Sequence, residues 1–152
     1  MIVTALALHV LAALIWVGGM IFSHFVLRPA VVDLEREARL ALWRQVLPHF
    51  FRLVWGSIIL LLVTGYFIVF EYFGGFAGVG LSVHLMQGLA FLMILLFTYV
   101  YTVPFSAFTS AMDDGDHDQA ALHFARIRLI ISLNLPLGVI CALIGATGRY
   151  WG

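Results

Sequence analysis

Histidine is the residue type in this chain best suited to chemistry, and two of the six histidines lie in apolar runs. His9 lies in the uncharged stretch that opens the chain, and His84 lies near the start of a later run. Neutral imidazole is a ligand for haem iron and for copper, and helical bundles hold haem between facing helices. A b-type haem or a copper ion between His9 and His84 is the first hypothesis. The alternative is that both rings only form hydrogen bonds with neighbouring helices.

Other residues would complete such a site. Trp16 follows His9 by seven residues, on the same face of a helix, and would wall a flat cofactor. Arg149 would pair with haem propionates. For copper, Met1 or Met86 would add a thioether ligand, because Cu(I) prefers sulfur and imidazole. Scattered methionines more often fill gaps between helices.

A second cluster of histidines is expected at the opposite end of the bundle. His24 follows His9 by 15 residues, which on a helix places it on roughly the same face and about 22 Å deeper. His49 and His123 lie at the starts of two other apolar runs. The three could ligate a second haem or a metal ion, although interfacial histidines also reach water. Four arginines near them would pair with propionates or, more ordinarily, with lipid head groups: Arg28, Arg52, Arg126 and Arg128.

The composition places these residues in lipid. Of the 152 residues, 63% are hydrophobic and 11% are charged, and the mean hydropathy is +1.06. Soluble domains carry about 25% charged residues. The balance excludes a disordered chain, a nucleic-acid binder and an ordinary soluble enzyme. No serine–histidine–acid set or phosphate loop is found, so hydrolase and kinase activities are excluded, while a membrane oxidoreductase stays open.

Four apolar runs are long enough to cross a bilayer as helices, which takes about 20 residues. They predict spans at about 3–28, 51–72, 81–110 and 127–149. The runs lack the polar alternation of a membrane barrel. We therefore expect residues 1–152 to form a single all-α membrane domain, a bundle of four transmembrane helices.

Arginine placement predicts the orientation of the bundle. The chain has no lysine, and seven of its eight arginines flank the connections between spans one and two and between spans three and four. The positive-inside rule places these connections in the cytoplasm. Both termini are then expected on the outer, periplasmic side of a bacterial inner membrane.

The inner connections are expected to be partly helical. Residues 33–47 predict an amphipathic helix that lies at the inner surface or extends the second span, and Pro48 is expected at the entry to that span. Asp116 or Asp118 is expected to cap a helix that runs into the fourth span.

Several short motifs resemble the copper-resistance D (CopD) family of bacterial inner-membrane proteins. They are the stretch from His9 through Trp16 to Gly19, the segment 27–30 (Leu-Arg-Pro-Ala), the segment 50–52 (Phe-Phe-Arg), the segment 62–65 (Leu-Val-Thr-Gly) and Val103-Pro104. The resemblance covers nearly the whole chain and implies copper uptake or tolerance. The chain is also similar to the HemJ type of protoporphyrinogen oxidase. Both families tend to carry a lysine early in the third helix, where this chain has His84 and Gln87.

Taken together, the residues and the resemblance predict an integral membrane protein that binds b-type haem for electron transfer or copper-linked redox work. The alternatives are copper transport without haem and HemJ-like porphyrinogen oxidation. The lipid bilayer is the first expected partner. A redox or copper-handling protein and a second copy of the chain are compatible with the sequence, and nucleic acid is not.

Overall fold

The structure is a computed structural model that describes residues 1–151, and it contains four long helical segments. These span Ile2–Ala30, Arg36–Glu71, Leu81–Asp113 and His117–Tyr150, and each is long and apolar enough to cross a membrane. No strand occurs in the described residues. The predicted all-α bundle with four transmembrane helices is therefore confirmed, and the chain is a multi-pass membrane protein.

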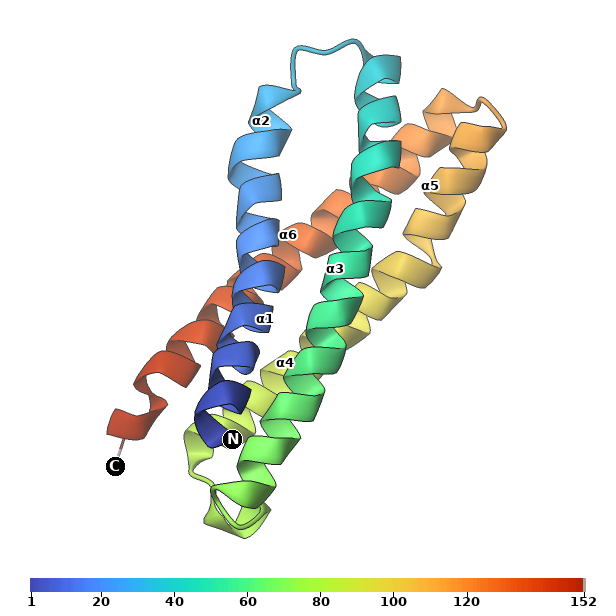
Figure 1. Ribbon diagram of the computed structural model, residues 1–152. Helices are drawn as coiled ribbons and strands as arrows, with labels where there is room; N and C mark the ends of the chain where they lie inside the picture. The colour runs from blue at the N-terminus through green and yellow to red at the C-terminus, as the bar shows by residue number, and fades with distance from the viewer. Residues whose placement is uncertain (152) are drawn as a thin grey trace.

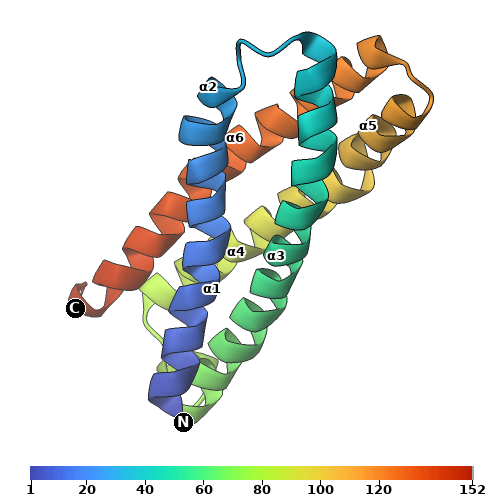
Figure 2. The ribbon, with the colours of Figure 1, turned by 45° about the horizontal axis from the view of Figure 1, so that its top comes forward.

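The helices form two antiparallel pairs (Figure 1). Helix α1 (Ile2–Phe22) packs against α3 (Arg36–Glu71), and α6 (His117–Thr147) packs against α4 (Leu81–Thr102) and α5 (Pro104–Asp113). Contacts between α1 and α6 join the pairs. Figure 2 shows both chain ends at one end of the bundle and the α2–α3 and α5–α6 connections at the other. We call the latter the loop end.

Helix α3 is longer than the predicted second span. It begins at Arg36 and continues without interruption through Pro48, so residues 36–47 extend the span instead of forming a separate surface helix. Proline tolerates this position because neighbouring helices compensate in membrane bundles for the hydrogen bond it cannot donate. Of the two readings of residues 33–47, the helical extension is the one found.

Two irregular segments interrupt the other helices. Residues Ser23–Leu27 form a π-helical turn, η1, which continues into the short α2 (Arg28–Ala30). The third span breaks at Val103, and α5 starts with Pro104, whose fixed φ and missing N–H suit the first position of a helix. Neither interruption was expected from the sequence.

The core of the bundle is aromatic near its middle. Phe51 of α3 and Phe97 of α4 are buried, and their ring centroids lie 5.4 Å apart in an edge-to-face arrangement. Trp55 packs edge-on against Phe97 at 5.2 Å. Such pairs stabilise by about 1 kcal/mol beyond area burial. This cluster fixes α3 against α4, and so sets the distance between the two helix pairs.

The loop end is joined by polar contacts. Asp116 caps α6, because its side chain accepts a hydrogen bond from the Gln119 N–H at 2.9 Å, as predicted. Arg44 pairs with Asp113 at 3.1 Å. Arg36 pairs with Asp118 at 2.6 Å. Both pairs join α3 to residues beside the α5–α6 connection and so hold the two helix pairs together at this end.

The opposite end is closed by a glycine-rich turn between α3 and α4. It contains the 3-10 helix η2 (Phe76–Gly78). Gly74 and Gly75 have φ values of +69° and +106°, which L side chains rarely adopt. The 3-10 turn η3 (Gly148–Tyr150) ends the fourth span nearby, in contact with α4.

Candidate functional site

His9 is held against α3 by a short chain of hydrogen bonds. Its Nδ1 atom lies 2.8 Å from the Thr64 hydroxyl oxygen. The same hydroxyl lies 2.6 Å from the Leu60 carbonyl oxygen, one turn back on α3. Thr64 is buried and His9 is partly buried. The histidine ring is thus fixed in the α1–α3 contact, at the end of the bundle that holds the chain ends.

The hydrogen-bond chain determines which ring nitrogen carries the proton. The Thr64 hydroxyl has one hydrogen, and the carbonyl oxygen of Leu60 can only accept. The hydroxyl therefore donates to Leu60 and accepts from His9, so the Nδ1 atom carries hydrogen. In the neutral ring, the Nε2 atom then holds the free lone pair. A histidine fixed through one nitrogen with the other nitrogen free is the usual arrangement of a metal ligand.

Gly65 allows the His9 ring to approach α3. A Cβ atom added at Gly65 would lie 3.2 Å from His9 Cε1, closer than ordinary van der Waals contact. The adjacent Thr64 and Gly65 thus act together, one as a hydrogen-bond partner and the other as a space. Both residues belong to the segment 62–65, which resembles the CopD family, but their contact with His9 was not expected from the sequence.

His84 lies at the start of α4, beside the turn that joins α3 to α4. Its exposed ring stacks on Phe76 with centroids 6.4 Å apart and an interplanar angle of 28°. Phe76 also packs edge-on against Tyr66 of α3 at 6.0 Å. The Gln87 amide donates to the Tyr66 hydroxyl at 3.2 Å. This aromatic group holds His84 at the same end of the bundle as His9, and a shared ligand of the two histidines stays a prediction.

Trp16 and Arg149 have protein partners of their own. Trp16 is buried, with its ring centroid 6.2 Å from that of Phe97 in an edge-to-face arrangement. Arg149 lies over the ring of Tyr150, 4.5 Å from its centroid, and donates to the Tyr150 hydroxyl. Their predicted roles toward a cofactor are not tested by these contacts.

His24 and His49 have different hydrogen-bond partners in the structure. His24 Nδ1 lies 3.3 Å from the Ser132 hydroxyl oxygen on α6. His49 is exposed, and its Nδ1 bonds the Gln45 carbonyl of its own helix at 2.9 Å. Among residues 1–151, no group of three or more histidine, cysteine or acidic side chains is placed to hold a metal ion. His24, His49 and His123 therefore do not form such a group, and their role as haem or metal ligands stays a prediction.

Sulfur atoms gather where α6 packs on α4 and α1. A Cβ atom at Gly138 would lie 3.0 Å from the Met93 methyl carbon and 3.3 Å from that of Met20. Two turns further on, the same construction at Gly145 lies 3.5 Å from the Met86 sulfur. The Cys141 thiol, between these glycines, donates to the Met86 carbonyl at 3.7 Å. Gly138 and Gly145 of α6 thus leave room for methionine side chains, and Met86 faces α6.

Comparison with known proteins gives one match. A family model described as "CopD: Copper resistance protein D" matches residues 44–149. No curated protein and no solved structure matches the chain. The matched range begins within α3 and ends in η3. It therefore includes Thr64, Gly65 and His84, while His9 precedes it.

Proposed function

Because the chain belongs to the copper resistance protein D family, we propose that it handles copper in a bacterial inner membrane through a site that includes His9. The observation that carries this proposal is the hydrogen-bond chain from His9 through Thr64 to Leu60. It assigns the lone pair of the neutral, partly buried imidazole to the Nε2 atom. An ionisable side chain in a membrane helix is a functional candidate by default.

The donor atoms near this end suit copper. Imidazole and thioether groups are ligands for Cu(I). His84 is exposed in the first turn of α4, at the same end of the bundle, and is the second proposed imidazole ligand. Met1 is exposed at the start of α1 and is the proposed thioether. Met86 is the weaker choice, because its sulfur lies against Gly145 of α6. The copper ion would be either cargo that is passed to a copper-handling protein partner, or a redox centre that stays bound.

A b-type haem held by His9 and His84 is the second proposal. The same Nε2 lone pair supports it, because an axial histidine is normally fixed through its other nitrogen. When bound, haem would supply one-electron transfer. Thr64 would hold the His9 ring in place as a ligand, and the aromatic residues around Phe76 would hold His84 as the second ligand.

One experiment separates these proposals. The protein is purified in detergent after expression with copper and haem supplied, copper and iron are counted per chain, and visible spectra are recorded oxidised and reduced. We expect about one metal ion per chain. A split reduced spectrum with iron supports haem, and a colourless protein with copper supports copper handling.

Variants test the role of His9. His9→Ala should abolish the bound metal, and Thr64→Val should weaken metal affinity by about ten- to a hundredfold, the usual effect of losing a supporting hydrogen bond. Thr64→Ser should restore it. His49→Ala is the matched control, because His49 is exposed and bonds only its own helix. Unchanged metal content in His9→Ala would overturn the proposal.

A further inference from the structure

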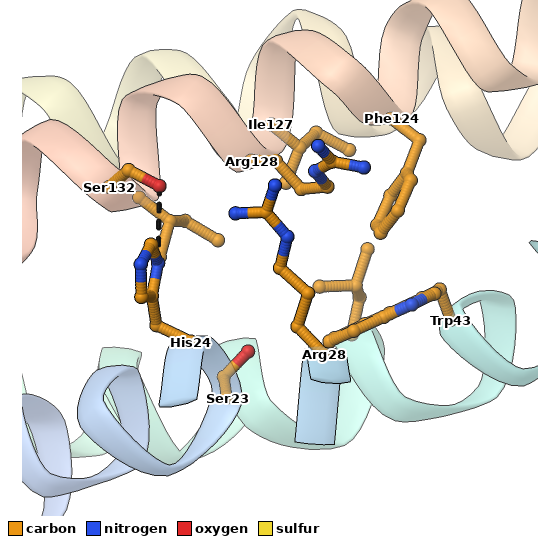
Figure 3. A pocket seen from close by; sticks show the side chains of 10 residues that line it. Ser23, His24, Arg28, Trp43, Phe124, Ile127, Arg128 and Ser132 are labelled. Carbon is orange, nitrogen blue, oxygen red and sulfur yellow. Dashed lines mark hydrogen bonds between the residues drawn. The ribbon is translucent and has the colours of Figure 1, made fainter. Parts of the chain in front are cut away.

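A pocket at the loop end is lined by two arginines and no acidic residue. It lies between the end of the first span and α6, with one wall from α3. Arg28 of α2 and Arg128 of α6 both line it: in Figure 3 the Arg28 side chain extends toward α6, and the Arg128 side chain lies beside Phe124. The other polar residues of the lining are Ser23, His24 and Ser132. The side chains of the pocket lining thus carry positive charge and no negative charge.

The two arginines have no carboxylate partner in the described residues. The salt bridges of residues 1–151 are formed by Arg36 and Arg44, outside this pocket. Arg128 is held beside Phe124, with its guanidinium carbon 5.7 Å from the ring centroid. Its Nε atom is buried and has no hydrogen-bond partner. Buried polar groups are normally paired, so this donor indicates a missing acceptor.

Two guanidinium groups in one pocket also repel each other. The repulsion is strong where apolar side chains lower the local dielectric constant, and here Trp43 and Ile127 are among the lining residues. An oxyanion between the arginines would remove the repulsion and accept the free N–H groups. Guanidinium groups bind phosphate oxygens in pairs, which gives such a site both charge and geometry.

The irregular turn η1 shapes the first wall of this pocket. Ser23, His24 and Arg28 belong to η1 or follow it directly. The wider π-helical turn changes the direction of successive side chains from that of a regular helix, and such turns are frequent at functional sites. His24 is fixed by its contact with Ser132, as the dashed line in Figure 3 shows. The lining is thus held together from two helices.

We propose that this pocket binds a phosphate-type oxyanion, with Arg28 and Arg128 as its two ligands. The pocket lies at the end of the membrane spans, where lipid head groups are found, and basic pockets between transmembrane helices bind anionic lipids. The chemistry is shared by a lipid phosphodiester and by free inorganic phosphate. The site is separate from the proposed copper site, which lies at the opposite end of the bundle.

Native mass spectrometry of the detergent-purified protein tests the proposal. Phosphatidylglycerol is titrated against phosphatidylcholine, and inorganic phosphate is added as a competitor. We expect the wild-type chain to bind phosphatidylglycerol at least about tenfold more tightly than phosphatidylcholine. A hydrogen bond to a charged group contributes about this much to affinity. Displacement by millimolar phosphate would identify free phosphate as the ligand, and its absence would identify the lipid.

Three variants locate the site. Arg28→Gln and Arg128→Gln should each lower the affinity for phosphatidylglycerol by about tenfold. They lie on different helices, so the same loss in both, at unchanged gel-filtration elution, is not a folding defect. Arg36→Gln is the matched control, because Arg36 is exposed at the same end of the bundle, lies outside the pocket and pairs with Asp118. An equal loss in Arg36→Gln, or equal retention of both lipids by the wild type, would overturn the proposal.

Discussion

At the scale of single residues, the central feature is a histidine whose partner fixes its proton. His9 stood out in the sequence because an imidazole in a membrane span is costly. Its partner Thr64 did not, since a lone threonine in an apolar run more often bonds its own helix. In the structure Thr64 does both: it donates to Leu60 and accepts from His9. A residue pair 55 positions apart is visible only once the helices are packed together.

A glycine substitution tests how closely the His9 ring must approach α3. In Gly65→Ala, the new Cβ atom would lie 3.2 Å from His9 Cε1 and push the ring away from Thr64. We expect metal affinity to fall by up to about tenfold, because the supporting hydrogen bond lengthens. Metal titration of the purified protein measures the change.

Gly56→Ala is the control for this substitution. It lies on the same helix, and a Cβ atom there has no neighbour within 4 Å. Its metal affinity should equal that of the wild type. If both alanine variants bind metal alike, the close approach at Gly65 has no role in positioning His9.

At the scale of elements, hydropathy predicted which segments form membrane-spanning helices, but it did not predict where those helices are interrupted. The four spans and the Asp116 cap could be predicted because each depends on neighbouring residues in sequence. The π-helical turn at Ser23–Leu27 could not, because nothing in the sequence Ser-His-Phe-Val-Leu distinguishes it from a regular helical turn. Pro48 and Pro104 show the same limit: α3 continues through the first, while the third span breaks at the second.

Gly138 lets α6 pack closely against α1 and α4, because it has no side chain. A Cβ atom at Gly138 would lie 2.9 Å from Val17 Cγ2 and 3.0 Å from the Met93 methyl carbon. In Gly138→Ala we expect the free energy of unfolding to fall by about 1–3 kcal/mol, as is usual for overpacked cores. Unfolding of the protein in detergent, followed by circular dichroism, measures this.

Gly88→Ala is the matched control in α4. Gly88 is exposed and has open space around its Cβ position. Alanine is the better helix former, by up to about 1 kcal/mol, so this variant should be as stable as the wild type or more stable. A similar loss in both variants would mean that Gly138 is not a tight packing point.

At the scale of the whole molecule, charge is concentrated at the loop end. Four arginines flank the α2–α3 connection, Arg126 and Arg128 lie in the half of α6 nearer this end, and Arg52 lies near the middle of α3, while the chain ends lie together at the opposite end (Figure 2). The same-end placement of the termini agrees with the even number of spans. Which end faces the cytoplasm stays a prediction from the positive-inside rule.

Cysteine labelling tests the orientation. With Cys141→Ala as background, Asp114→Cys is placed at the loop end and Glu71→Cys near the α3–α4 turn; both positions are exposed. A membrane-impermeant maleimide should label position 114 only in inverted vesicles and position 71 only in right-side-out vesicles, because the arginines retain the loop end inside. The reverse pattern would contradict the prediction.

The turn between α3 and α4 also bears on how the chain enters the bilayer during synthesis. On the predicted orientation, it is the internal connection that must be carried across the membrane. It runs from Tyr72 to Gly80 without a charged residue, and Glu71 at the end of α3 is the one acidic residue beside it. Moving it through hydrocarbon therefore transfers no arginine, unlike moving the arginine-bearing connections. Helices α3 and α4 can then enter the membrane as a hairpin whose turn crosses, with the charged connections left behind in the compartment of the ribosome.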